Sequence, residues 1–95
     1  MIYPTIHLNG TAASDLYDQY AAVADSLRES IRIMRENGPN ARDYYVNPKH
    51  GAFQLAVEEH TARVQALLVV LFDVESILAH ISDSQDSHKS SSPAA

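Results

Sequence analysis

Apolar side chains recur every three or four residues along two stretches of the chain. Between Thr11 and Asn37 they are Leu16, Tyr20, Val23, Leu27, Ile31 and Met34. Residues three and four positions apart share one side of an α-helix, so this spacing predicts an amphipathic helix over residues 11–37. The Thr11 hydroxyl is suited to cap its first turn. Gly38, in a left-handed conformation and followed by a proline, is suited to end it.

The second stretch shows the same spacing over a longer distance. Its apolar seam consists of Phe53, Val57, His60, Val64, Leu67, Leu71, Val74, Leu78 and Ile81. Asn47 and Pro48 precede this seam and suit the cap and the first position of a helix, which predicts a helix over residues 48–82. Two amphipathic helices joined by a short connection predict an all-α fold built as a long antiparallel hairpin.

The segment LLVVLF, residues 67–72, is apolar on every side of the predicted second helix. A single neighbouring helix covers only one stripe, so it leaves much of this surface in water. The second helix also extends beyond the first by about 13 Å at the usual helical rise. Both features predict that the hairpins associate into a homo-oligomeric helical bundle, either a dimer of four helices or a larger assembly.

The two ends of the chain do not carry the helical pattern. Residues 1–10 hold β-branched and aromatic side chains with a proline and a glycine, and they predict an extended N-terminal arm. No large apolar residue follows Ile81, so residues 83–95 are predicted to be a disordered tail. The predicted domain therefore covers residues 11–82.

Composition excludes several classes of protein. Among 95 residues there are no cysteines, and 7 basic against 12 acidic side chains give a formal charge of −5. A negative chain is poorly suited to neutralise phosphates, so direct binding of DNA or RNA is not expected. The N-terminus lacks the pattern of a signal peptide. The longest unbroken apolar run, residues 66–72, falls short of the roughly 20 residues of a membrane span, so we expect a cytoplasmic protein.

The chain shows no pattern typical of a metal site or of catalysis. Glu58, Glu59 and His60 are consecutive and therefore point in different directions from a helix, which does not match the ligand spacing of helical di-metal sites. There is no G-x-S-x-G motif and no cysteine nucleophile, so catalysis would depend mainly on histidines such as His7 and His50, which can act as acid or base near neutral pH. The sequence therefore predicts a protein that is not an enzyme, with no catalytic residue, metal or cofactor.

The connection between the two helices is unusually rich in polar and aromatic side chains. Within the segment from Asn40 to Lys49 the candidate ligand-binding residues are Asn40, Arg42, Asp43, Tyr44, Tyr45 and Lys49. Aromatic rings can stack on a base, and the cationic groups can bind a phosphate, so the set predicts a site for a small nucleotide-like anion. The alternative is structural: tyrosines in such a loop can simply cover the end of a bundle.

The arm contributes a second group of polar side chains, namely His7, Asn9 and Thr11. They lead into a helix N-terminus, where free amide groups favour an anion. In one hairpin this end lies far from the loop, but in an antiparallel dimer the arm of one subunit can meet the loop of the other. The sequence therefore predicts composite sites between subunits.

Two motifs resemble those of a family of small helical proteins encoded by tailed phages and prophages. They are YPTIHLNGT, residues 3–11, and PNARDYY, residues 39–45, and the resemblance extends to about residue 81. Members often continue the second motif with a proline, whereas this chain has Val46 and places its proline at position 48. The resemblance implies a phage accessory protein in the bacterial cytoplasm, with counter-defence by sequestering a nucleotide signal as one role by analogy.

Different functional hypotheses follow from these features. The first is a non-enzymatic oligomer that sequesters a small nucleotide-like anion. The second is an inhibitor or adaptor that binds a host or phage protein through acidic helical positions, which are Asp18, Asp25, Glu29, Glu58 and Glu75. A third is a structural component of virion assembly, which the residues do not separate from the second.

Overall fold

The computed structural model describes residues 1–90. Within that range the chain is helical apart from the N-terminal arm and the connection between the two long helices. Helix α1 spans Ala13–Glu36, a short 3-10 helix η1 spans Ala41–Asp43, and α2 spans Ala52–Ser90. No strand occurs in residues 1–90. The prediction of an all-α fold is confirmed.

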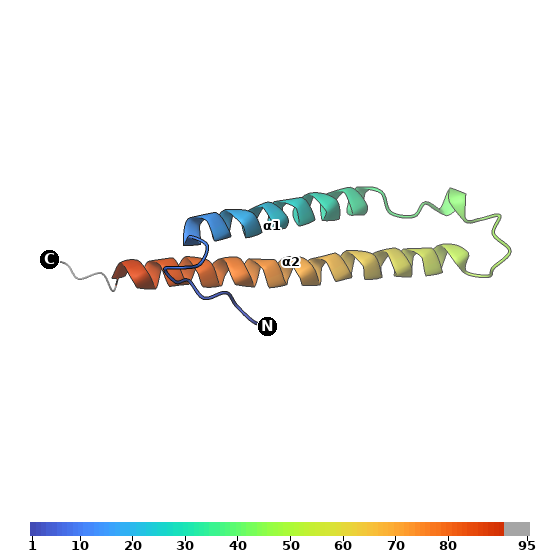
Figure 1. Ribbon diagram of the computed structural model, residues 1–95. Helices are drawn as coiled ribbons and strands as arrows, with labels where there is room; N and C mark the ends of the chain where they lie inside the picture. The colour runs from blue at the N-terminus through green and yellow to red at the C-terminus, as the bar shows by residue number, and fades with distance from the viewer. Residues whose placement is uncertain (91–95) are drawn as a thin grey trace.

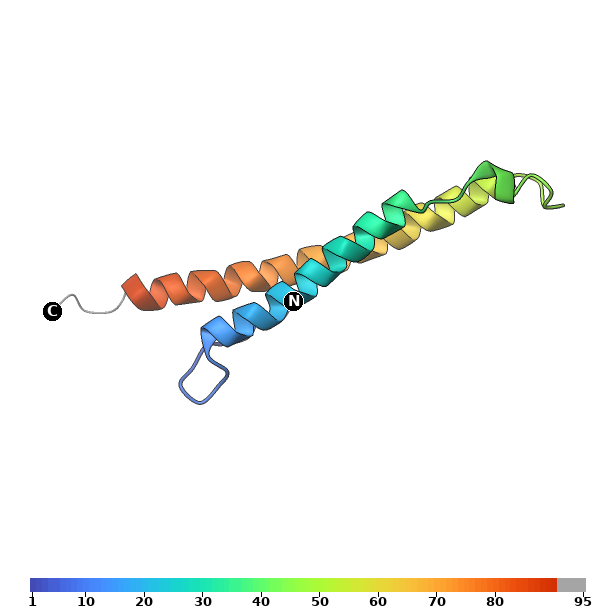
Figure 2. The same cartoon turned by 90° about the horizontal axis from the view of Figure 1, so that it is seen from above.

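The two long helices lie side by side and run in opposite directions (Figure 1). The molecule is a rod of 74 × 21 × 21 Å, and α1 crosses α2 at a shallow angle when seen from above (Figure 2). The connection between the helices, residues 37–51, lies at one end of the rod. The N-terminal arm lies at the other, beside the C-terminal part of α2 (Figure 1).

The core is a single seam between the helices. Its buried side chains are Ala24, Ile31, Val64, Leu71, Val74, Leu78 and Ile81. Every buried position of α2 belongs to the predicted apolar seam, and Leu67 packs against the cluster. One position of α1 differs, because Val23 is 45% exposed while its neighbour Ala24 is fully buried. Ala24 is seven residues from Ile31 and shares its side of the helix, where a small side chain allows close approach of α2.

The predicted ends of α1 are wrong in detail. Ala12, not Thr11, occupies the N-cap position, and no side chain bonds to the first turn. Gly38 does not adopt a left-handed conformation, since Gly51 is the only residue with positive φ in the described part of the chain. Asn37 ends α1 instead: its backbone N–H and its side-chain amide donate to the Ile33 carbonyl at 3.1 and 2.8 Å. The Ile33 carbonyl thus accepts two bonds from Asn37, whereas a left-handed glycine at position 38 would serve the carbonyl of Met34 or Arg35.

Helix α2 begins four residues later than predicted. The Asn47 side chain accepts from the backbone N–H of Lys49 at 2.9 Å, two residues along the chain. This contact builds a local turn, which competes with the helix that Pro48 was expected to start. Gly51, with φ of 72°, then redirects the chain so that α2 begins at Ala52.

Helix α2 also continues beyond its predicted end. We expected a helix to residue 82 and a disordered tail from residue 83, whereas α2 extends to Ser90. The polar residues after Ile81 lower the helix propensity only slightly, and neither glycine nor proline occurs before Pro93. The remainder of the predicted tail, residues 91–95, lies outside the described residues.

One histidine fastens the N-terminal arm to α2. The His80 ring stacks on Tyr3 with ring centroids 4.7 Å apart, and its Nε2 lies 3.0 Å from the Pro4 carbonyl oxygen. The arm then turns at residues 7–10, where the N–H of Gly10 donates to the His7 carbonyl. Leu8, at the tip of that turn, is fully exposed to solvent. The arm therefore crosses α2 near residue 80 before α1 begins.

Much of the apolar surface of α2 is uncovered. Val69, Val70 and Phe72 are 60%, 47% and 56% exposed, as the composition of residues 67–72 indicated. The segment Ala52–Gln85 is long and apolar enough, by length and composition, to cross a membrane. The unbroken apolar run did not reveal this because it stops at Asp73, and further apolar residues follow that charge. The expectation of no membrane span therefore stays a prediction.

Replacement of Leu71 tests whether the seam carries the stability of the hairpin. Leu71 is 6% exposed, so Leu71→Ala removes buried methyl groups and leaves a cavity. We expect a loss of about 2 to 5 kcal/mol in the free energy of unfolding. Urea unfolding at one fixed protein concentration measures it. Gln65→Ala, at an exposed position, is the control and should change the free energy of unfolding by less than about 0.5 kcal/mol. Equal urea midpoints for the two variants would contradict the burial of Leu71 in the seam.

Candidate functional site

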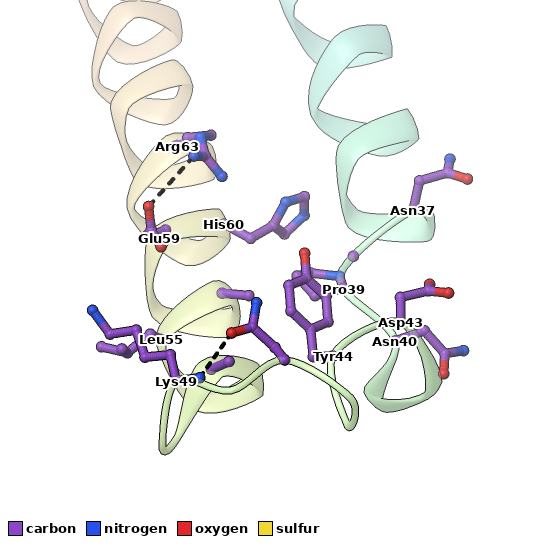
Figure 3. A pocket seen from close by; sticks show the side chains of 14 residues that line it. Asn37, Pro39, Asn40, Asp43, Tyr44, Lys49, Leu55, Glu59, His60 and Arg63 are labelled. Atoms are coloured by element: carbon purple, nitrogen blue, oxygen red, sulfur yellow. Dashed lines mark hydrogen bonds and ion pairs between the residues drawn. The ribbon is translucent and has the colours of Figure 1, made fainter.

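A cavity of about 520 Å³ lies at one end of the rod (Figure 3). It is formed between the first turns of α2 and the connection of residues 37–51, which we call the loop. Its polar and charged lining residues are Asn37, Asn40, Asp43, Asn47, Lys49, Glu59, His60 and Arg63. Tyr44 contributes an aromatic ring, and small apolar residues of α2 form the floor. The cavity thus combines a ring, amides and charges of both signs in a volume suited to a small molecule.

Local hydrogen bonds shape the loop side of the cavity. The Asn40 side chain accepts from the backbone N–H of Arg42 at 3.2 Å and starts η1. The Tyr44 ring, which directly follows η1, packs against Phe53 of α2 with ring centroids 6.1 Å apart and a tilt of 54°. Tyr44 is half-buried as a result. The same ring therefore anchors the loop and lines the cavity.

The His60 side chain connects α2 to the end of α1 beneath the cavity. Its Nε2 lies 2.7 Å from the Met34 carbonyl oxygen in the last turn of α1, which also accepts from the Asn37 N–H at 3.3 Å. A carbonyl only accepts, so Nε2 carries the proton and donates. The ring fills the space beside Gly38, whose added Cβ would lie 3.6 Å from it. His60 therefore links the two helices and also lines the cavity.

The charged groups of the cavity are loosely paired. Arg63 lies 3.7 Å from Glu59, and both side chains are well exposed. For the side chains of Lys49 and Asp43, no ion pair or hydrogen bond is present within residues 1–85. Exposed pairs of this kind contribute little to stability. These charges are therefore available to a ligand at small energetic cost.

The structure brings together some predicted site residues and separates others. Asn40, Asp43, Tyr44 and Lys49 share the cavity. Arg42 is exposed outside it, and Tyr45 is 80% exposed beside a neighbouring hollow formed by residues 44–54. His7, Asn9 and Thr11 lie with the arm at the opposite end of the rod (Figure 1). There His7 lines a second cavity of about 650 Å³ with His80 and Ser84, and Asn9 and Thr11 line neither cavity.

Sequence reasoning missed the contribution of α2. Glu59 and Arg63 were not among the predicted site residues, and His60 was considered only as a seam residue or ligand. The signal that identifies them is helical spacing, because Ala52, Ala56, Glu59 and Arg63 recur in steps of four, three and four next to the loop. Such positions share one side of the helix.

Beyond the cavity, that side of α2 carries Val70 and Ile77, with the exposed Asp73 between them. The positions on this side include Ala56, Glu59, Arg63, Val70 and Ile77, which are spaced by three, four, seven and seven residues. The other side carries Leu68, Phe72 and Glu75, and there Arg28 bridges Asp25 and Glu75 at 3.1 and 3.3 Å. The cavity and the exposed Val70 therefore face the same direction, away from the bridge.

Charged groups elsewhere in α1 form their own pairs. Arg32 lies between Glu29 and Glu36, and its hydrogen bond to Glu29 lowers the pKa of that carboxyl below its ordinary value. The same contacts raise the pKa of Arg32. Among the described side chains, no group of three or more His, Asp or Glu residues is arranged to hold a metal ion.

Comparisons with protein-family models, with curated proteins and with solved structures find no match to this chain. A function for the chain must therefore be inferred from the geometry of the cavity and of the two helices.

Removal of the His60 ring tests its role as a link between the helices. In His60→Ala the Met34 carbonyl keeps only its 3.3 Å bond from the Asn37 N–H, and we expect a destabilisation of about 1 kcal/mol in urea unfolding. The adjacent exposed residue supplies a matched control, Thr61→Ala, which should stay within about 0.5 kcal/mol of the wild type. If His60→Ala unfolds at the wild-type midpoint, the contact carries no stability.

Proposed function

We propose that this chain is a non-enzymatic binding protein that sequesters a small nucleotide-like anion in sites completed by a second copy of the chain. The observation that carries the proposal is the cavity at the loop end, where Lys49 and Arg63 lie with the Tyr44 ring. The two cations supply partners for phosphate, and the ring supplies a face or edge for a base.

One chain alone leaves this cavity open to solvent. Most of its charged lining residues are exposed, and only Pro39, Tyr44, Ala52, Ala56 and His60 are half-buried. Ligand sites usually bury most of the ligand surface. A covering element is therefore needed, and its position is indicated by Val70, which faces the same direction as the cavity.

A second copy of the chain, related to the first by a two-fold axis near Val70, supplies that cover. In an antiparallel pair, a residue that precedes Val70 on one chain lies opposite a residue that follows Val70 by the same number on the other. The cavity residues of α2, Ala52 to Arg63, would then lie opposite residues of about 77–88 in the partner. His80 and Ser84 fall in that range and line the arm cavity, which also includes His7. The proposed site joins the loop of one subunit to the arm of the next.

A membrane is the competing way to cover the apolar surface of α2. Charged groups argue against it, because Arg28 and Glu75 form an ion pair between the helices on the side of α2 that carries the exposed Phe72. Arg32, Glu29 and Glu36 are also exposed on α1. Placing this hairpin in a bilayer would carry those charges into hydrocarbon at considerable cost. A second hairpin covers Val70 and leaves the charged side in water.

The biological role follows from the resemblance of the arm and loop motifs to phage proteins. We propose a phage accessory protein that acts in the bacterial cytoplasm, where sequestration of a nucleotide signal would counter a host defence. Sequestration needs binding without turnover. A cavity with loosely paired charges suits that task.

The alternative role, an inhibitor or adaptor that presents an acidic helical surface, has less support. Asp25, Glu29 and Glu75 form ion pairs with arginines of α1, so they present less negative charge than the sequence indicates. Asp18 and Glu58 remain as exposed acidic positions far apart along the rod. No observation specifically favours a role in virion assembly.

Ligand binding can be tested by thermal unfolding in the presence of nucleotides. A ligand at a hundredfold excess over its Kd adds about 2.7 kcal/mol, which should raise the melting temperature by roughly 10 °C in a chain of this size. Lys49→Ala and Arg63→Ala should abolish most of the shift. Arg35→Ala is the matched control outside the cavity and should retain it. An unchanged wild-type melting temperature with every nucleotide at millimolar concentration would reject the proposal.

The dimer can be tested by sedimentation velocity with two neighbouring substitutions. Val70 faces the same direction as the cavity and Val69 does not, although both are largely exposed in one chain. Val70→Glu places a charge in the proposed interface and should give a monomer at roughly micromolar concentration. Val69→Glu should remain at least dimeric. A wild-type chain that sediments as a monomer would remove the intersubunit site.

A further inference from the structure

Asp73 places a charge on the side of α2 that the second subunit is proposed to cover. It is exposed and lies between Val70 and Ile77 on that side. Within residues 1–85 its side chain makes no hydrogen bond or ion pair, whereas Glu75, two positions later, pairs with Arg28 at 3.3 Å. A carboxylate covered by apolar surface loses hydration that only a cation or a hydrogen-bond donor can replace. A subunit that packs on this side must therefore bring such a group to Asp73.

Arg63 is the cation of α2 that matches this charge. It is the only lysine or arginine among residues 52–85, and its side chain is 63% exposed. Its ion pair with Glu59 is long, at 3.7 Å, and lies on the surface of the helix (Figure 3). A guanidinium carries five N–H donors in a planar fork, so Arg63 can bind a further carboxylate while it keeps this contact.

The positions of Arg63 and Asp73 along α2 suit a two-fold axis. Position 68 is midway between them, and it lies about 3 Å along the helix from Val70. Two antiparallel copies of α2 related by an axis at that level bring Arg63 of each subunit opposite Asp73 of the other. Ala66 lies on the same side, three positions after Arg63, and it is exposed. Its small side chain allows the two helices to approach closely enough for the contact.

The two residues also lie on matching edges of that interface. Arg63 precedes Val70 by seven residues, nearly two full turns, which places it about 20° to one side of Val70. Asp73 follows Val70 by three residues, less than one turn, which places it about 60° to the other side. A two-fold rotation exchanges the two sides, so Arg63 of one subunit and the partner's Asp73 lie on the same edge. In a parallel pair each residue would instead face its own copy, which is a contact between like charges.

From these positions we infer that Arg63 of one subunit forms an ion pair with Asp73 of the other, and that two such pairs set the antiparallel direction and the register of the dimer. The inference rests on the second subunit of the proposed function and adds the residues that align it. It also connects the interface to the site, because Arg63 lines the loop cavity and Asp73 does not. Asp73 is therefore a positioning residue, which holds the guanidinium of the other subunit at the cavity.

Exchange of the two charges tests the ion pair in the full-length chain, with the Kd of the dimer measured by sedimentation equilibrium. Arg63→Glu and Asp73→Arg should each raise this Kd about tenfold or more, because each places like charges at both contacts. An equimolar mixture of the two variants should return the Kd to within about threefold of the wild-type value, because every contact in the mixed dimer joins opposite charges. The double variant Arg63→Glu/Asp73→Arg should do the same.

Two matched controls make the same changes in charge away from this side of α2. They are Arg35→Glu on α1 and Glu58→Arg, whose side chain is one residue and so about 100° from that of Glu59 around α2. Charges outside the contact are screened by salt, so both controls should keep the Kd within about threefold of the wild-type value. Circular dichroism of every variant confirms that its helices are retained, as expected for exposed positions.

The outcomes separate the ion pair from the function on which it rests. Single variants that dimerise as tightly as the wild type would overturn the ion pair and leave the dimer intact. Single variants that are weakened, but recover neither in the mixture nor in the double variant, would also overturn it, since exchanged charges must restore a true pair. A wild-type chain that sediments as a monomer would overturn both the ion pair and the intersubunit site.

Discussion

The structure depends on the packing of α1 against one stripe of α2. A helix of 24 residues can cover only part of a helix of 39 residues, and only on one side. This contact buries the seam from Val64 to Leu78, whereas it leaves Val69, Val70 and Phe72 exposed. A single hairpin therefore leaves more apolar surface in water than a chain of this size can readily tolerate. This deficit is the physical reason to expect a second subunit.

The same mismatch in length creates the candidate site. Because α1 ends at Glu36 and α2 begins at Ala52, the connecting residues must run along the first turns of α2 to close the hairpin. His60 holds the end of α1 to α2, and the Tyr44 ring holds the loop to Phe53. Between these two fixed points lies the cavity, with its charges loosely paired. The scaffold thus fixes the backbone around the cavity while leaving the polar groups free for a ligand.

Hydrophobic spacing predicted the helices and the seam well, because burial of one apolar stripe is the main driving force for folding a hairpin. It failed at the helix ends, where local hydrogen bonds decide: Asn37 replaced Gly38 as the end of α1, and the Asn47 turn delayed α2. Of the loop residues predicted to bind a ligand, Asp43, Tyr44 and Lys49 line one cavity, and their binding of a ligand stays a prediction. Glu59 and Arg63 were missed because their role depends on which side of α2 the loop covers. Composition of the loop alone does not contain that information.

Our central proposal is that the loop cavity is occupied by a small molecule within an assembly of at least two chains. Native mass spectrometry of the protein purified gently from the cells that produce it, followed by denaturation of the same sample, tests both parts at once. We predict an even number of subunits that carries a nucleotide-like small molecule, released on denaturation and identified by its mass. A monomer, or an assembly whose mass equals that of its chains alone, would contradict the proposal.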